Sequence, residues 1–212
     1  MTRWGTYQVK GLLCAALFLW STAAGADADT PIAQMRQTLN ELLPILSDES
    51  LKAPGQEAER RAKIRQVLSQ RFDYATMAKD ALGKHWQTLS KTQQKQFIPL
   101  FSSLLEREHV KRIEQYGASQ KSVSFVGETI EPDGHAVVQI EIADPRDPMT
   151  SEDVKYRLYK RGSNWYVYDI LIDGGSMVTN YRTQFDRIIL QESYDELVRR
   201  LQTSPANTKP TP

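Results

Sequence analysis

The chain has 212 residues, with 27 lysines and arginines against 26 aspartates and glutamates, and 40% of its residues are hydrophobic. This near balance of charge excludes the basic footprint of a nucleic-acid-binding protein, so we expect no nucleic-acid partner. The single cysteine and the three scattered histidines offer no metal-ligand spacing. We therefore predict neither a metal nor another cofactor.

The first 26 residues have the pattern of a secretory signal peptide. Arg3 and Lys10 form a basic start, and the apolar residues 11–20 are too few to span a bilayer. Residues 24–26 read AGA, which fits a cleavage site for small residues. We therefore expect a cleaved signal, with a membrane anchor as the alternative.

Cleavage would leave a mature chain that starts at Asp27, and its expected location is the periplasm. Residues 27–202 are long enough for one domain with its own core. Residues 203–212 are polar and rich in proline, which predicts a disordered tail.

The first part of this domain has helical periodicity, with apolar residues three and four positions apart. Thr30, Asp73 and the capping box Ser90-x-x-Gln93 mark the starts of helices. The predicted helices span residues 32–46, 57–70, 74–82 and 91–116.

The pattern then changes to the alternation of β-strands, and the predicted strands span residues 123–127, 135–142, 154–161 and 165–172. Ser176 and Ser193 then cap two further helices. Helices, an antiparallel meander and helices again predict an α+β fold. In this fold a four-stranded antiparallel sheet wraps around helices and encloses an apolar cavity.

Residues 168–185, YDILIDGGSMVTNYRTQF, form the most distinctive segment, and they hold no nucleophile, metal cluster or phosphate loop. Such a segment favours a protein that holds a ligand over an enzyme, so we predict no catalytic residues. Asp169 and Asp173 lie four apart on a predicted strand and thus on one face. An acid–base pair of a small-molecule enzyme is therefore one alternative. A structural adaptor with a filled cavity is another.

Two blocks of the sequence resemble one protein family. Residues 72–105 have the pattern FD-x-x-x-MA-x-x-ALG-x-x-W followed by Q-x-x-x-F-x-x-x-F-x-x-LL, and residues 167–185 have VYD, G-x-S and V-x-NYR-x-QF. These blocks resemble the MlaC-type periplasmic phospholipid-binding proteins, also called toluene-tolerance proteins, over about residues 32–202. The resemblance implies a fold similar to the cone of nuclear transport factor 2, and a lipid carrier that is not an enzyme.

The resemblance also implies a cargo and partners. Such a carrier moves phospholipid between an outer-membrane lipoprotein complex and an inner-membrane ABC transporter complex with a lipid-binding periplasmic domain, which maintains the lipid asymmetry of the outer membrane. Gly175, Met177 and His109 depart from the family pattern. A hopanoid or another lipid is therefore the alternative cargo.

The matching positions and the apolar faces of the predicted strands indicate which side chains bind lipid. The predicted lipid-binding residues are Phe72, Met77, Leu82, Trp86, Phe97, Phe101, Leu104, Leu105, Val138, Ile140, Tyr156, Leu158, Tyr168, Met177, Tyr181 and Phe185. Lys84 and Arg182 are expected at the mouth of the cavity, because a phosphate head group should stay in contact with water.

Overall fold

The computed structural model describes residues 29–118, 121–144 and 147–203. The predicted signal peptide lies outside these residues, as does the predicted tail 203–212 except for Thr203, which is the last residue of a helix. The elements are α1 (Pro31–Ser47), α2 (Glu49–Lys52), α3 (Glu57–Ser69), α4 (Tyr74–Leu82), the 3₁₀ helix η1 (Gly83–Thr88), α5 (Lys91–Ala118), β1 (Ser122–Ile130), β2 (His135–Asp144), β3 (Asp147–Arg161), β4 (Asn164–Ile172), β5 (Gly175–Ser176), α6 (Met177–Gln191) and α7 (Tyr194–Thr203).

The helices start where the sequence indicates that they should. At five starts a side-chain oxygen accepts the backbone N–H three residues later, which satisfies a donor that the helix leaves free, whereas α3 has no side-chain cap. The accepting residues are Thr30, Asp73, Ser90, Ser176 and Ser193. The side chain of Gln93 reaches back to the backbone N–H of Ser90, which completes the predicted capping box.

The strands form one antiparallel sheet with the order β1-β2-β3-β4-β5. The predicted α+β class and the antiparallel meander are confirmed. The fifth strand is an addition of two residues, because Gly175 and Ser176 pair with Ile172 and Leu171 before α6 begins.

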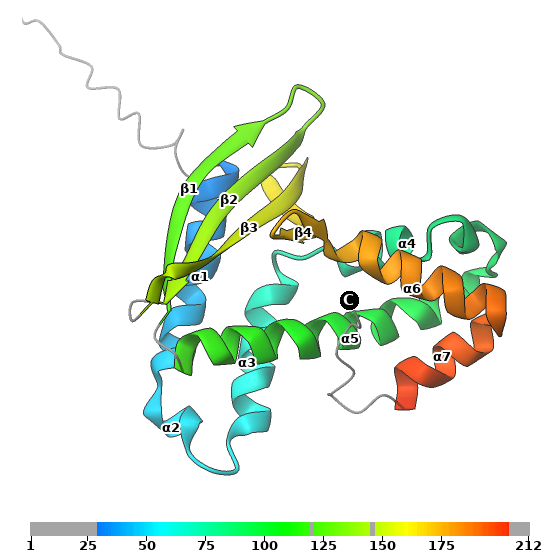
Figure 1. Ribbon diagram of the computed structural model, residues 1–212, viewed down its shortest axis with the longest axis horizontal. Helices are drawn as coiled ribbons and strands as arrows, with labels where there is room; N and C mark the ends of the chain where they lie inside the picture. Colours follow the sequence, from blue (N-terminus) through cyan, green and yellow to red (C-terminus); the bar gives the residue numbers. More distant parts are fainter. Residues whose placement is uncertain (1–28, 119–120, 145–146, 204–212) are drawn as a thin grey trace, which may run out of the picture.

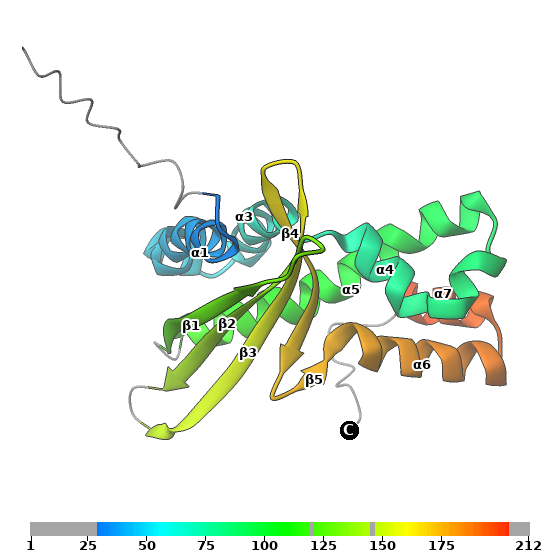
Figure 2. The ribbon, with the colours of Figure 1, turned by 90° about the horizontal axis from the view of Figure 1, so that it is seen from above.

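The elements form two groups. The sheet, α1, α2, α3 and the end of α5 make up what we call the pocket half, where α1 packs against β1, β2 and α3 (Figure 2). The start of α5 packs with α4 and α7 at the opposite end of the molecule, and α6 packs on α4 and α7 (Figure 1). We call these elements, together with η1, the helical half.

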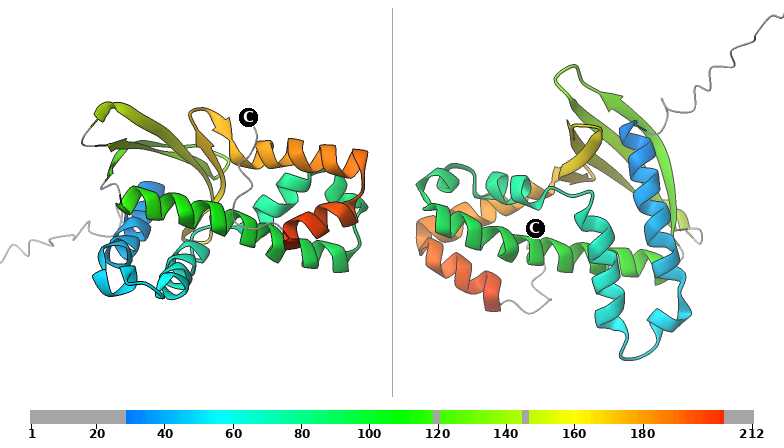
Figure 3. Two further views of the ribbon diagram at one scale, coloured as in Figure 1. Left: turned by 60° about the horizontal axis from the view of Figure 1, so that its bottom comes forward. Right: turned by 180° about the vertical axis from the view of Figure 1, so that it is seen from behind.

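Helix α5 belongs to both halves, as the two views of Figure 3 show. The chain also joins the halves just before α4, where the N–H of Asp73 donates to the carbonyl of Val167 at 2.9 Å. The N–H of Val167 donates in turn to the carbonyl of Arg71 at 2.9 Å. One buried hydrophobic core extends through both halves. Within the described residues, every helix is too short or too polar to span a membrane.

Candidate functional site

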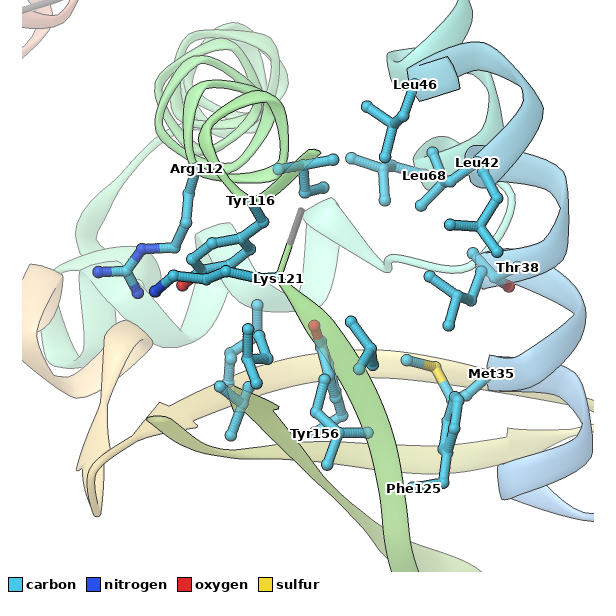
Figure 4. Close-up of a pocket in the computed structure, with 18 of the residues that line it drawn as sticks. Met35, Thr38, Leu42, Leu46, Leu68, Arg112, Tyr116, Lys121, Phe125 and Tyr156 are labelled. Carbon is cyan, nitrogen blue, oxygen red and sulfur yellow. The ribbon is translucent and has the colours of Figure 1, made fainter. Parts of the chain in front are cut away.

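A pocket of about 150 Å³ lies in the pocket half, between α1, the end of α5 and the inner face of the sheet (Figure 4). Its lining is mostly aliphatic and aromatic. The apolar lining residues are Met35, Leu39, Leu42, Leu43, Leu46, Leu68, Phe72, Ile113, Val123, Phe125, Ile140, Ile142, Val154, Tyr156, Ile170 and Ile172. A surface of this kind binds apolar groups by excluding water.

The local sequence explains why these side chains meet. Apolar residues of α1 recur three and four apart, so they form a stripe along one side of the helix. In the strands every second residue points to the same face. The pairs Ile140 and Ile142, Val154 and Tyr156, and Ile170 and Ile172 therefore cover the inner face that α1 and α5 enclose.

The charged side chains of the lining gather at one side of the pocket. Arg112, Tyr116 and Lys121 also line it. The hydroxyl of Tyr116 donates to Glu152 Oε2 at 2.6 Å, and Lys121 Nζ lies 3.1 Å from Glu152 Oε1. Lys121 Nζ also lies 4.9 Å from the centre of the Tyr116 ring. The pocket is therefore amphipathic, with an apolar end and a charged end.

Burial and hydrogen bonds shift the pKa values of residues at the charged end. Burial alone would raise the pKa of Glu152, but hydrogen bonds from Tyr116 and Lys121, with the charges of Lys121 and Arg112, hold it below its usual range. Burial, and then the hydrogen bond to Glu152, raises the pKa of Tyr116. Burial raises the pKa of Tyr156 to about 12. At neutral pH Glu152 is therefore charged, whereas both tyrosines are neutral.

A buried hydrogen-bond cluster fixes the first half of α1 against the sheet. Gln34 Oε1 accepts from Arg71 Nη1 at 2.5 Å and from the backbone N–H of Trp165 at 3.0 Å. The amide nitrogen of Gln34 donates to the carbonyl of Ser163 at 2.9 Å, and Arg71 Nε donates to Thr38 Oγ1 at 3.2 Å. This cluster holds α1 against the β3–β4 hairpin.

The structure brings three of the predicted lipid-binding residues to the pocket wall, namely Phe72, Ile140 and Tyr156. Others are buried in the core without lining the pocket, and these are Met77, Leu82, Phe97, Phe101, Leu105, Val138, Leu158, Tyr181 and Phe185. Trp86, Leu104 and Met177 are half-buried against the same core. Lipid contact by these twelve residues stays a prediction.

Most of these aromatic side chains pack against one another between α5 and α6. The Phe97 and Phe101 rings stack with their centres 5.9 Å apart, and Phe185 meets them edge-on at 5.9 and 5.8 Å. Tyr181 meets Phe101 edge-on at 5.5 Å. Such contacts are those of a close-packed core.

Tyr168 lies on the outer face of the sheet. The pairing of β3 with β4 shifts between Arg157 and Leu158, and this irregularity changes the alternation of β4. The Tyr168 ring meets His135 edge-on, with centres 5.6 Å apart, and it lies 6.2 Å from the ring of Tyr159. A lipid in the pocket would therefore be separated from Tyr168 by the sheet.

The two residues expected at the mouth, Lys84 and Arg182, lie in the helical half and do not line the pocket. Lys84 Nζ pairs with Asp186 Oδ1 at 2.8 Å. Arg182 Nε donates to the carbonyl of Asp80 at 2.6 Å, and its side chain covers Gly83. Both cations therefore have partners that hold α6 near α4 and η1, and their role with a head group stays a prediction.

The two aspartates of the enzyme alternative do not line the pocket either. Asp169 is buried, and it accepts the backbone N–H groups of Ile170 and Val178 and the hydroxyl of Ser176. Asp173 occupies a turn with a positive φ of 48°, and its carboxylate accepts the N–H of Asp153 at 3.4 Å. Asp169 therefore anchors the start of α6. The described residues also contain no cluster of three or more potential metal ligands.

Sequence reasoning missed the contribution of α1 and of the end of α5. The apolar stripe of α1 was visible in the sequence, and it could have suggested that Leu39, Leu42 and Leu46 face a cavity. Arg112 and Tyr116 lie four apart and thus on one side of α5, which is the only signal the sequence holds for the charged end.

The fold is similar to that of a phospholipid-binding protein from Ralstonia solanacearum whose structure was solved in complex with a phospholipid. The TM-score is 0.66 at 24% sequence identity, and the match covers 84% of this chain and 96% of that chain. The family described as MlaC protein matches residues 36–203, which is well over half of the chain. The chain belongs to the MlaC protein family.

Proposed function

We propose that this protein binds a phospholipid and that an acyl chain of this lipid lies in the pocket between α1 and the sheet. The observation that carries this proposal is the apolar lining of that pocket, together with its charged end. Membership of the MlaC family and the phospholipid held by the similar Ralstonia protein support it. The role is binding and transport, with no chemical step.

The energetics suit a carrier. Burying one CH₂ group contributes about 0.8 kcal/mol, so an acyl chain of about 16 carbons gains about 12 kcal/mol on leaving water. The same chain loses a similar amount when it leaves a membrane. The net affinity therefore depends on how well the pocket fits the chain, which allows both loading and release.

The size of the pocket adds a requirement. A cavity of about 150 Å³ is of the size that holds a benzene molecule, whereas ligand pockets usually measure about 300–1,000 Å³. An acyl chain must therefore widen the pocket. Met35 and the leucines of α1 suit this change, since thioether and aliphatic side chains repack at low cost.

We further propose that the protein shuttles lipid through the periplasm, after cleavage of its signal peptide. Its partners would be an outer-membrane lipoprotein complex and an inner-membrane ABC transporter complex, and its role the maintenance of outer-membrane lipid asymmetry. A hopanoid is the alternative cargo, because most of the pocket lining is apolar and would also accept a rigid hydrocarbon.

Purified protein should carry lipid. Extraction with organic solvent followed by mass spectrometry is expected to yield phospholipid in near-stoichiometric amount, and delipidated protein should take up phospholipid from donor vesicles. Hopanoid in the extract would favour the alternative cargo. Absence of any lipid, together with no uptake from vesicles, would refute the proposed function.

A pocket-filling variant locates the site. Leu39→Trp places an indole at a half-buried position of the wall, and it should lower lipid uptake at least tenfold, because the ring occupies the space of the chain. Leu190→Trp is the matched control, since Leu190 is exposed on α6 and outside the pocket. Equal uptake by the two variants would place lipid elsewhere in the molecule.

A further inference from the structure

Arg112 is a cation at the pocket that makes no hydrogen bond or ion pair with any described residue. It is half-buried, so its charge is only partly hydrated. The neighbouring cation, Lys121, differs because it pairs with Glu152. Two positive charges and one negative charge therefore lie together, and within the described part of the chain one positive charge has no counterpart.

The two sides of the pocket differ in polarity. The polar ends of Arg112, Tyr116 and Lys121 extend to one side, whereas Leu42 and Leu46 lie on the opposite side (Figure 4). A molecule with an apolar tail and an anionic end therefore fits in one orientation only. Its tail faces the leucines, and its anionic end remains at the half-buried cation, close to water.

We propose that Arg112 binds the phosphodiester of the lipid head group, with Lys121 as a second donor. This inference rests on the proposed function and assigns the polar end of its ligand. A guanidinium presents parallel N–H donors that match two phosphate oxygens, and such charge-assisted pairs are the strong ones. The single negative charge of a phosphodiester equals the unmatched positive charge of the site.

The test compares two lipids with the same acyl chains. Delipidated protein is mixed with vesicles that contain either phosphatidylglycerol or diacylglycerol, which lacks the phosphate. Wild-type protein should prefer phosphatidylglycerol. Arg112→Gln should lower its uptake about tenfold and leave diacylglycerol uptake unchanged, because only the phosphate contact is lost. Arg112→Lys retains the charge but lacks the planar pair of N–H donors. Its uptake of phosphatidylglycerol should lie between that of wild type and that of Arg112→Gln.

Lys95→Gln is the matched control, because it removes the same charge from an exposed position of the same helix and should change neither uptake. If Arg112→Gln lowers the uptake of both lipids to the same degree, or lowers the uptake of neither, the assignment is overturned. Inorganic phosphate that competes as well as the lipid would show a free-phosphate site and overturn it too. If wild-type protein takes up neither lipid, the proposed function itself fails.

Discussion

Glu152 joins two of the residues that line the pocket, since it accepts the Tyr116 hydroxyl and pairs with Lys121. This carboxylate is about a quarter exposed, at 27% of its side chain. Its hydrogen bonds come from a residue of α5 and from one just before β1. A single acid therefore holds the charged end of the pocket together, and its protonation should loosen that end.

Glu152→Gln should reveal this role through pH. Because the folded pKa lies below the unfolded value of about 4.3, the carboxylate stabilises the fold above that value, and the contribution disappears as the pH falls through the folded pKa. The variant should lose about 1 kcal/mol of unfolding free energy at about pH 7 and less at about pH 3. Urea unfolding at each pH measures this free energy for the variant and for wild type.

Glu141→Gln is the control for this pH dependence, since Glu141 is exposed on β2 and does not line the pocket. At about pH 7 its unfolding free energy should lie within about 0.5 kcal/mol of the wild-type value, because a substitution at an exposed position changes stability little. A Glu152→Gln deficit that grows as the pH falls would contradict the role assigned to this carboxylate.

At the scale of elements, α1 is attached to the sheet more firmly at its start than at its end. The Gln34 cluster holds the first turns, and the N–H of Ile32 donates to Glu128 Oε2 at 2.7 Å. Further along, Pro44 lacks an N–H for the helix, and Leu43 is 50% exposed. The second half of α1 is therefore the wall that can yield when an acyl chain enters.

Gln34→Ala should weaken the attachment of α1. Its loss removes one of the acceptors of Arg71 and the side-chain acceptor of the buried N–H of Trp165, which should cost about 1–3 kcal/mol of unfolding free energy. Gln37→Ala on the exposed side of the same helix should cost less than about 0.5 kcal/mol. Similar urea midpoints for the two variants would disprove the importance of the cluster.

Helix α5 explains why the sequence located the site only in part. Its 28 residues extend about 42 Å, so Phe97 and Phe101 pack in the helical half while Ile113 and Tyr116 reach the pocket. Periodicity identifies which side of a helix is buried, but it cannot tell a filled core from a pocket. In the sequence, the motif residues that fill the core therefore have the same periodicity as the residues that line the pocket.

Other features were predictable because they depend on short stretches of chain. The caps at Thr30, Asp73 and Ser176 and the alternation of the strands are local, and the structure contains them. The irregular pairing that puts Tyr168 on the outer face depends on a neighbouring strand. The hydrogen bond from Tyr116 to Glu152 depends on how β3 packs near α5. Local signals do not specify such long-range geometry.

At the scale of the whole molecule, the pocket lies in one half and the aromatic core in the other. A ligand that binds only the folded state stabilises it, by about 2.7 kcal/mol when its concentration is a hundred times the dissociation constant. Local opening of the pocket half should respond more than opening of the helical half, because only its residues line the pocket.

Hydrogen exchange should therefore distinguish the two halves. Reloading delipidated protein with phospholipid is expected to slow exchange in α1, β1 and β2, and to leave α6 and α7 nearly unchanged under conditions of local opening. The unloaded protein serves as the reference. Equal protection of α6 and α7 would instead indicate that lipid reaches the aromatic core, as the motif residues in that half predict.

The sheet order has a consequence for self-association. β1 forms one edge of the sheet, and it exposes Val126 and Ile130 by 58% and 52%. An exposed edge strand with apolar side chains invites another chain to pair with it and aggregate. Here the pairing shifts between Phe125 and Gly127, so the bulge interrupts the regular row of backbone groups. At the opposite edge β5 covers only Leu171 and Ile172 of β4, and the backbone of Val167 is bonded to Arg71 and Asp73. Both edges are thus interrupted, which disfavours pairing with another chain.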